Sequence, residues 1–529
     1  MGIYFNPGNN SFTRAVKSSI YLDKTGLLEE LNMLIGTEDN CIALSHARRF
    51  GKSQAAGMLD AYYSLGCDSE ELFSNFEIAK QDDFEEHLNK YNVIHVDISS
   101  VADYHKEDLV EECIKRIYSD FHKQYGDSLD YSKDIHLVIT DIFERIQIPF
   151  IIIIDEWDCV IRNASDQPEL VHRYLQFLHS LFKSEESKSY LALAYITGIL
   201  PIKKIEDESA LNNFKEYSMI EADQLTRYFG FTQEEVNGLC EKYSLDEESI
   251  KGWYNGYLIS GEHMYNPNSV CEAIRRKRLD SYWKNTSAFE TINKFITLNF
   301  DGLKEDIISM LQDKEVRVNT STFQNEFVGI RTKDEALTAL IHLGYLGYDA
   351  NRKRAFIPNF EVKMAYQAAL EVGEWTEVAN TIRNCDELLD LTIEGEQERV
   401  AELIEEFHST YTSMLQYNDE NSLSCVLTMA YFTAPAYYTI LREMPTGKGF
   451  ADMVFIPRAN AGNRPAMIVE LKYDESADTV IRQIKERRYA GALKDYGANI
   501  LMVGISYEKD SSNSNYKKHT CVIEKFRND

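Results

Sequence analysis

The apolar positions of this chain predict a first region built from alternating strands and helices. Between about residues 20 and 200, four strand-like runs are separated by helix-like segments. These runs occupy 40–46, 91–99, 149–156 and 190–198. The third run, PFIIIIDE, is apolar on both faces, which is typical of a central strand in a parallel sheet. Strands that alternate with helices in this way predict an α/β domain with a parallel sheet.

The pattern changes after residue 200. Residues from about 205 to 300 look helical and irregular, with the turn-rich islands WYNGY and YNPNS. A helix followed by a hairpin is predicted over 334–359, and this order favours a winged-helix-like unit. Residues 360–418 look helical and acidic. Strand-like runs return in the last region, at 450–457, 465–472 and 498–507.

Length and composition limit the classes of protein that fit this pattern. A chain of 529 residues is too long for one hydrophobic core, so two to four domains are expected. No apolar run approaches the roughly 20 residues of a membrane span. The polar residues 1–10 do not resemble a secretory signal. We therefore expect a cytoplasmic protein that does not bind a membrane.

The net charge limits the partners that we expect, and the cysteine content limits the disulfide and zinc sites. The formal net charge of −29 repels nucleic acid at long range and argues against a general DNA-coating protein. It leaves room for an enzyme with a local basic groove. The nine cysteines are scattered and never form a C-x-x-C pair, so neither a disulfide framework nor a zinc site is indicated.

The tripeptide Gly51-Lys52-Ser53 stands between a predicted strand and a predicted helix. In a phosphate-binding loop, backbone N–H groups surround the phosphates, the lysine adds a point charge and the serine hydroxyl binds Mg²⁺. The usual loop also begins with a glycine, but His46 occupies that position. The tripeptide alone is weak evidence, because a helix that begins with a surface lysine has the same sequence.

A second motif strengthens the nucleotide hypothesis. The run PFIIIIDE ends in Asp155 and Glu156. An aspartate at a strand end can hold the Mg²⁺ shell, and the next glutamate can polarise the attacking water. Thr197 ends the fourth run, either as a sensor of the γ-phosphate or as a hydroxyl that caps a turn. In this order and in an α/β setting, these residues predict an ATP site whose Mg²⁺ is bound by Ser53 and Asp155.

The last region carries a second constellation of carboxylates. Asp452 lies on one predicted strand, and Glu470 and Lys472 share one face of the next, because side chains alternate along a strand. Phosphodiester hydrolysis needs carboxylates that hold Mg²⁺ and a lysine or base that positions water. A helix predicted over 477–493 follows and carries Gln483. The same helix carries Arg482, Lys485, Arg487, Arg488 and Tyr489. An exposed strand with alternating Glu and Lys is the ordinary alternative.

Seven short segments give the chain the outline of a known family. They are YLDKT (21–25), RRFGKS (48–53), IIDEWD (153–158), TGILPIKK (197–204), WYNGY (253–257), YNPNSV (265–270) and IPNFEV (357–362). These segments resemble the bacterial AAA-ATPase-like family that carries a C-terminal PD-(D/E)XK nuclease-like domain. The strand–strand–helix order D…E-x-K…Q is likewise similar to the core of that nuclease-like domain.

The resemblance implies roles for further residues. The family's loop typically reads Arg-Pro-Arg-Arg-Phe-Gly-Lys-Ser or -Thr, so the missing first glycine is a family trait. Here His46 and Ala47 replace the Arg-Pro pair. The resemblance implies that Arg48 and Arg49 supply charge at the phosphates, with surface solvation or an ion pair as the alternative. It also implies that Glu420 is a further metal ligand.

The resemblance also implies the fold. We expect an α/β multidomain protein with a P-loop NTPase parallel sheet, a helical and winged-helix middle region and a C-terminal restriction-endonuclease-like α/β domain. The expected segments are an ATPase domain (1–210), a helical lid (211–300), a winged-helix-like and helical connector (301–418) and a nuclease-like domain (419–529).

The leading hypothesis is an ATP-hydrolysing protein coupled to a Mg²⁺-dependent nuclease for DNA, with RNA and Mn²⁺ as alternatives. Glu156 would serve ATP hydrolysis, whereas Asp452, Glu470, Lys472 and Gln483 would serve cleavage. The resemblance suggests genome defence or mobile elements. The rival is a nucleotide-dependent switch or scaffold whose nuclease-like domain only binds partners, which the negative charge favours. A homo-oligomer stays open, since AAA-type proteins often form rings.

Overall fold

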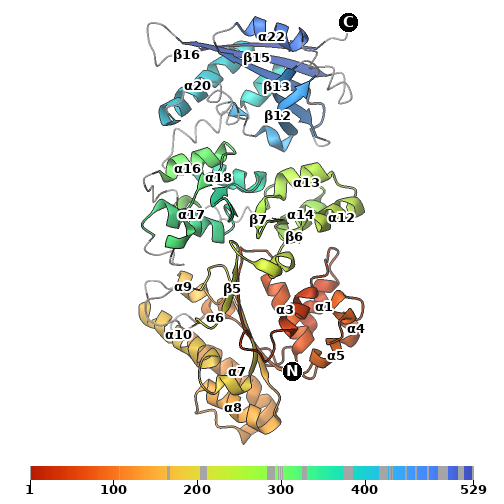
Figure 1. The fold of residues 1–529 in the computed structure, drawn as a ribbon, viewed down its shortest axis with the longest axis vertical. Helices are drawn as coiled ribbons and strands as arrows, with labels where there is room; N and C mark the ends of the chain where they lie inside the picture. The colour runs from red at the N-terminus through yellow and green to blue at the C-terminus, as the bar shows by residue number, and fades with distance from the viewer. Residues whose placement is uncertain are drawn as a thin grey trace. The chain divides into compact units, whose positions relative to one another are not determined.

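The computed structural model covers most of the chain (Figure 1). The residues that it describes are 2–105, 108–163, 167–202, 211–282, 292–295, 297, 300, 302–323, 330–372, 385, 387–415, 427, 430–431, 433–446, 449–458, 461–473, 476–486, 499–509 and 517–526. In these parts of the chain, no helix is long and apolar enough to cross a membrane.

A five-stranded parallel sheet forms the centre of the N-terminal region, in the order β2–β3–β4–β1–β5. Its strands are β1 (Cys41–Ser45), β2 (Asn92–Asp97), β3 (Phe150–Asp155), β4 (Leu191–Gly198) and β5 (Lys215–Ser218). The four predicted strands are confirmed, and β5 is an additional one. All six residues of β3 are buried, as a run that is apolar on both faces predicts.

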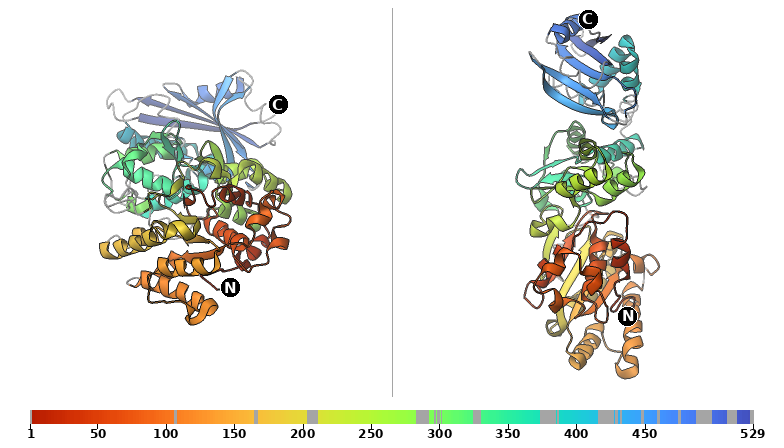
Figure 2. Two further views of the ribbon diagram at one scale, coloured as in Figure 1. Left: turned by 60° about the horizontal axis from the view of Figure 1, so that its bottom comes forward. Right: turned by 90° about the vertical axis from the view of Figure 1, so that its right-hand side faces the viewer.

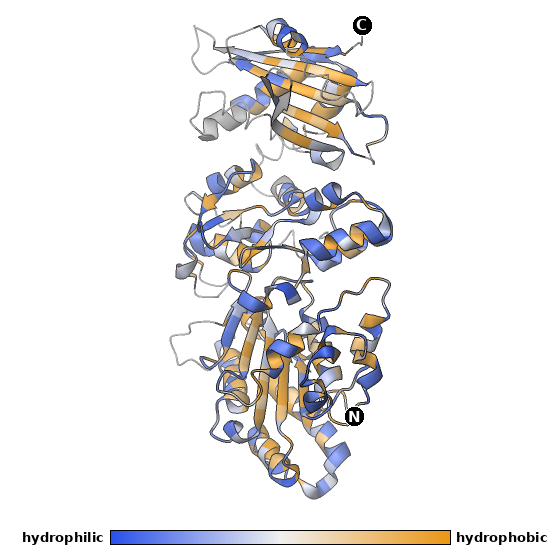
Figure 3. Cartoon of the chain, turned by 45° about the vertical axis from the view of Figure 1, so that its right-hand side comes forward, coloured by the Kyte–Doolittle hydropathy of each residue, from blue (hydrophilic) through white to orange (hydrophobic). Residues whose placement is uncertain are grey.

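Different helices cover the two faces of this sheet, whose central strands are coloured mostly as apolar in Figure 3. Ile151 and Ile153 of β3 pack on one face, and Ile152 and Ile154 pack on the other. The first face is covered by α1 (Asn10–Val16), α2 (Gly26–Asn32), α3 (Lys52–Tyr63), α4 (Glu70–Phe73) and α5 (Phe84–His87). The second is covered by α6 (Ile98–Ala102), α7 (Leu109–Tyr125), α8 (Ile135–Ile146), α9 (Cys159–Asn163), α10 (Pro168–Phe182) and α11 (Ser187–Tyr190).

The register of this sheet brings three strand ends to one edge. Ser45 at the end of β1 pairs with Gly198, and Ile154 of β3 pairs with Ile196. Asp155 therefore ends β3 next to Thr197 of β4, with β1 on the other side of β4. In open parallel sheets, ligands bind at the carboxyl ends of the strands, so this edge is where a site is expected.

The region from 205 to 300 contains a small sheet that the sequence did not predict. Its order is β6–β8–β7, and both pairings are antiparallel. The strands are β6 (Phe231–Thr232), β7 (Tyr257–Ile259) and β8 (Glu262–Tyr265), and the helices of this stretch of the chain are α12 (Gln233–Tyr243), α13 (Glu247–Tyr254) and α14 (Pro267–Arg276). The two turn-rich islands thus flank short strands.

The predicted order of a helix and a following hairpin is confirmed. Helix α17 (Lys333–His342) precedes β10 (Gly347–Asp349) and β11 (Arg354–Phe356), which are neighbours in a three-stranded sheet with β9 (Val316–Arg317). The other helices of the middle region are α16 (Leu303–Leu311), α18 (Phe360–Val372) and α20 (Gln397–Leu415).

The C-terminal region is a five-stranded mixed sheet in the order β12–β13–β14–β15–β16. Its strands are β12 (Tyr438–Thr446), β13 (Gly449–Pro457), β14 (Ala466–Tyr473), β15 (Ile500–Lys509) and β16 (Lys517–Lys525). Helix α22 (Ala477–Glu486) packs on one face, and α20 packs on the other (Figure 2). The three predicted strands are confirmed as β13, β14 and β15, and an α/β multidomain fold is confirmed with them.

The chain forms two compact units whose segments alternate along the sequence. The first unit comprises Met1–Tyr243, Gly256–Glu272 and Arg317–Ala355. The second comprises Ser244–Asn255, Ala273–Val316 and Phe356–Asp529. The division into four consecutive segments at 210, 300 and 418 stays a prediction.

The close packing of α22 on β15 generates a stability prediction. A β-carbon on Gly504 would lie 2.9 Å from the carbonyl oxygen of Ala477, and backbone cannot move aside cheaply. We expect Gly504→Ala to lower the free energy of unfolding by about 1–3 kcal/mol. Urea unfolding measures the effect. Gly238→Ala in α12 is the control, since no atom lies within 4 Å of its β-carbon, and it should be neutral or stabilising by up to about 1 kcal/mol.

Candidate nucleotide and metal sites

The loop between β1 and α3 has the backbone shape of an anion-binding loop. Arg49 and Gly51 have φ values of 69° and 96°, in the left-handed region. A β-carbon on Gly51 would meet no atom within 4 Å, so its conformation, rather than crowding, favours glycine there. Turns of this kind direct successive N–H groups towards an anion. The loop opens into α3, whose N-terminus adds a partial positive charge.

Lys52 is buried inside this loop. Its Nζ donates hydrogen bonds of 2.8 and 3.0 Å to the carbonyl oxygens of His46 and Ala47. Burial lowers the pKa of Lys52, while the carboxylates of Glu156 and Asp155 act in the opposite direction. The ammonium group thus lies among carbonyl oxygens and near two acids, where a phosphate group would supply further negative charge.

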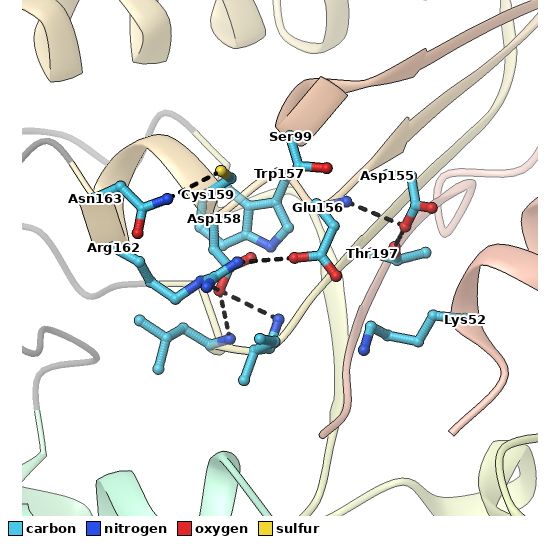
Figure 4. A network of polar contacts seen from close by, with 12 residues as sticks. Lys52, Ser99, Asp155, Glu156, Trp157, Asp158, Cys159, Arg162, Asn163 and Thr197 are labelled. Atoms are coloured by element: carbon cyan, nitrogen blue, oxygen red, sulfur yellow. Dashed lines mark hydrogen bonds and ion pairs between the residues drawn. The ribbon is translucent and has the colours of Figure 1, made fainter. Parts of the chain in front are cut away.

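Asp155 lies beside Thr197 at the ends of two neighbouring strands (Figure 4). The buried Thr197 hydroxyl donates to the Asp155 carboxylate, which also accepts the N–H of Glu156 at 3.1 Å. Both contacts fix the orientation of the carboxylate. Figure 4 shows Lys52 reaching into the space beside these groups. The structure therefore brings together Lys52, Asp155, Glu156 and Thr197, which come from three separate parts of the sequence.

Glu156 is held by an arginine that the sequence did not single out. Arg162 of α9 forms ion pairs of 2.8 Å with both Glu156 and Asp158. Asp158 in turn accepts the N–H groups of Ile199 and Leu200. Burial raises the pKa of Glu156, while Lys52 and Arg162 act to lower it. The spacing of four residues between Asp158 and Arg162 is the signal that could have found this pair.

The other residues of the loop differ in their exposure to solvent. Arg48, Arg49 and Ser53 are exposed. The His46 ring is fully buried, with its centroid 5.5 Å from that of Phe229. Burial lowers the pKa of His46 to about 3, so the ring is neutral at physiological pH. A neutral, buried ring thus fills the position where the usual loop has its first glycine.

In the C-terminal sheet, the strands hold the predicted carboxylates on one face. Met453 pairs with Val469, so the next positions, Asp452 and Glu470, lie opposite one another on β13 and β14. Asp452 Oδ2 accepts the N–H of Leu471 at 2.7 Å. Glu470 is only 1% exposed, and its Oε1 lies 3.7 Å from Nζ of Lys472. Two carboxylates suit a hard divalent cation, and the neighbouring lysine can contact a phosphodiester beside it.

Helix α22 covers the same face as this pair. Ile481 and Ile484 pack with Val454 and Ile468 in one cluster, while Gln483 of the same helix is half-buried. Lys485 forms a 2.6 Å ion pair with Glu524. Of the other predicted residues, Glu420, Arg487, Arg488 and Tyr489 lie outside the described residues.

Two regions of the chain match the models of known families. Residues 8–206 match the model of the AAA-ATPase-like family, described as predicted AAA-ATPase. Residues 418–517 match the PD-(D/E)XK nuclease superfamily. These matches contain the two constellations built above, and they confirm the resemblance inferred from the sequence motifs. They support ATPase activity in the first region and nuclease activity in the second.

Two individual proteins are similar over much of the chain. An uncharacterized protein in the vnfD 5′ region of Azotobacter chroococcum mcd 1 is 24% identical over 520 residues, which is 93% of each chain. The ORC2 protein of Aeropyrum pernix, solved in ADPNP and ADP complexes, is 13% identical with a TM-score of 0.29, covering 69% of this chain and 97% of that one. At that score the structural likeness carries no conclusion about this chain.

The ion pair of Glu156 generates a prediction about pH. If ionised Glu156 serves ATP hydrolysis, activity is lost as the pH falls through its pKa, which burial raises above 4.5. Because Arg162 acts to lower that pKa, Arg162→Gln should move the acidic limb of kcat/KM to higher pH. Arg162→Lys keeps the cation and should move it less. A limb that stays in place or moves to lower pH in a folded Arg162→Gln protein would contradict this role.

Proposed function

We propose that this chain, which joins a AAA-ATPase-like region to a PD-(D/E)XK nuclease superfamily region, is a cytoplasmic ATPase that controls a metal-dependent nuclease for DNA. The observation that carries the proposal is the meeting of Lys52, Asp155, Glu156 and Thr197 at one edge of the parallel sheet. A lysine in a helix-opening loop, a strand-end aspartate and a following glutamate are the groups that nucleotide hydrolysis needs.

Each group has a role that its position supports. The N–H groups of the loop and the Lys52 ammonium bind the phosphates of ATP, and Arg48 and Arg49 add charge from the exposed side of the loop. Asp155, oriented by Thr197, and Ser53 are the residues that would hold Mg²⁺, which supplies charge neutralisation at the phosphates. Glu156 orients the attacking water and accepts its proton.

The second site fits the same logic. Asp452 and Glu470 are the residues that would hold Mg²⁺ or Mn²⁺, which supplies a Lewis acid at the scissile phosphate. Lys472 and Gln483 position the water and the phosphate. The fit rests on the two facing carboxylates, since one of them is buried with a lysine as its neighbour. A metal-free pair of this kind would be costly to keep ionised.

A second candidate function is a nucleotide-dependent switch whose C-terminal domain only binds a partner. The near-complete burial of Glu470 and the net charge of −29 favour it, because both work against the approach of a phosphodiester. The resemblance to a family linked with genome defence or mobile elements fits either candidate.

A cleavage assay distinguishes the two candidates. Single- and double-stranded DNA and RNA are incubated with the full chain, Mg²⁺ or Mn²⁺, and ATP or ADP. We expect Asp452→Asn and Glu470→Gln each to lower cleavage of DNA by about 100-fold or more. Lys52→Ala should abolish the difference between ATP and ADP.

The control is Asp478→Asn, which removes an exposed carboxylate of α22 outside the strand pair. It should leave cleavage unchanged. Absence of cleavage in every protein, together with ATP hydrolysis that Lys52→Ala abolishes, would favour the switch. Cleavage that is equal with ATP, with ADP and in Lys52→Ala would contradict control by the ATPase.

A further inference from the structure

The YNPNS island at 265–269 has no role in the proposed reaction, yet it contacts the phosphate-binding loop. Asn266 follows β8 directly and donates from Nδ2 to the carbonyl oxygen of Arg48 at 3.3 Å. A second contact comes from the turn before β6, where the N–H of Gly230 donates to the carbonyl oxygen of Phe50 at 3.0 Å. Two carbonyl groups of the loop are therefore held by the small sheet of the same unit.

The carboxamide of Asn266 is fixed in its orientation. Its Oδ1 accepts the N–H of Asn268 at 3.0 Å, which leaves Nδ2 to face the loop. The side chain is only 1% exposed, so this donor is shielded from water. A shielded hydrogen bond of this kind is costly to lose, because the carbonyl group of Arg48 would then lack its donor.

The position of Gly230 is equally constrained. Its φ of 98° lies in the left-handed region, and a β-carbon would lie 3.1 Å from both Phe50 Cδ1 and the carbonyl oxygen of Tyr265. The Phe50 ring meets the Tyr257 ring edge to face at 5.1 Å. Tyr257, the last residue of the WYNGY island, thus also packs on the loop. Glycine is needed here so that two backbones can approach.

Through peptide geometry, these contacts determine the direction of the N–H groups of the loop. The described backbone contains no cis peptide bond, and in a trans peptide the C=O and the following N–H point in opposite directions. Holding the carbonyl groups of Arg48 and Phe50 against the small sheet therefore turns the N–H groups of Arg49 and Gly51 to the opposite side of the loop. Those two residues are the ones with left-handed φ values.

We infer that Asn266 is a positioning residue of the nucleotide site. Asn266 and Gly230 donate hydrogen bonds that hold the outer side of the phosphate-binding loop. These two hydrogen bonds set the orientation of the peptide planes whose N–H groups bind the phosphates. They constrain, at Arg48 and Phe50, a loop in which His46 stands in place of the usual first glycine. The inference rests on the proposed nucleotide site, and it gives the YNPNS island a function in phosphate recognition.

The test compares ATP and ADP binding, by calorimetry, in the full chain and in Asn266 variants. Asn266→Ala removes the donor, and Asn266→Asp places a carboxylate oxygen against the Arg48 carbonyl oxygen. We expect each to weaken binding of both nucleotides by about 10-fold or more, with Asp the weaker binder. The kcat at saturating ATP should stay within about twofold of the native value, because Asn266 touches none of the reacting groups. A general loss of structure would lower kcat as well.

Asn268→Ala is the matched control, because it changes the same island but keeps the N–H that bonds Asn266. It should bind ATP like the native chain. If the alanine variant does not fold, Asn266→Gln carries the test, since it keeps the carboxamide but moves it by one methylene. Native affinity in the folded Asn266 variants would overturn the inference and leave the proposed function intact. Absence of ATP binding by the native chain, unchanged in Lys52→Ala, would instead overturn the proposed function.

Discussion

The N-terminal unit depends on the placement of one buried ammonium group. Lys52 is enclosed by the loop that it belongs to, with its hydrogen bonds directed at carbonyl oxygens of that loop. Isolated charges are expensive to bury, and the acids at the end of β3 offset the positive charge of Lys52. The parallel sheet makes this compensation available, because it brings the end of β3 and the start of α3 to one edge. The strand order of the parallel sheet therefore also determines which side chains meet at the site.

The C-terminal sheet also contains a buried charge with an opposite charge beside it, but here both groups lie on one strand. A carboxylate on β14 is almost fully buried, and its positive neighbour comes from the same strand two residues later. The helix that covers this face can lie close only because β15 has a glycine under it. The acids are thus placed at the border of the apolar cluster, where strands β13 and β14 still run side by side. Both regions compensate a buried charge with opposite charge at the end of an apolar core.

The sequence predicted those elements whose burial is visible in a short window. The runs that became β1, β3, β4 and β14 are apolar because both of their faces are covered. In the two five-stranded sheets, the strands that it missed, β5, β12 and β16, are all edge strands. Edge strands are less enclosed, and β5 reads Lys-Glu-Tyr-Ser, with two exposed residues.

The same logic applies to the site residues. Lys52, Asp155 and Glu156 were predictable, because a Gly-Lys-Ser tripeptide before a helix and a strand end are local signals. The contact between Asn266 and Arg48 joins residues 218 positions apart, and no local pattern encodes it. The ion pair of Arg162 with Glu156 could not be predicted without knowing the direction in which α9 follows strand β3. Long-range partners such as Asn266 and Arg48 become visible only when the fold is known.

The alternation of the two units along the chain has a consequence for how such a protein can be inherited. The chain passes from one unit to the other five times, at 243/244, 255/256, 272/273, 316/317 and 355/356. Neither unit is encoded by one continuous stretch, so a single recombination event cannot exchange one and keep the other whole. One of the passages falls inside helix α14. The two units are therefore expected to evolve as a single heritable block, and a homologue that retains only one of them would need several coordinated deletions.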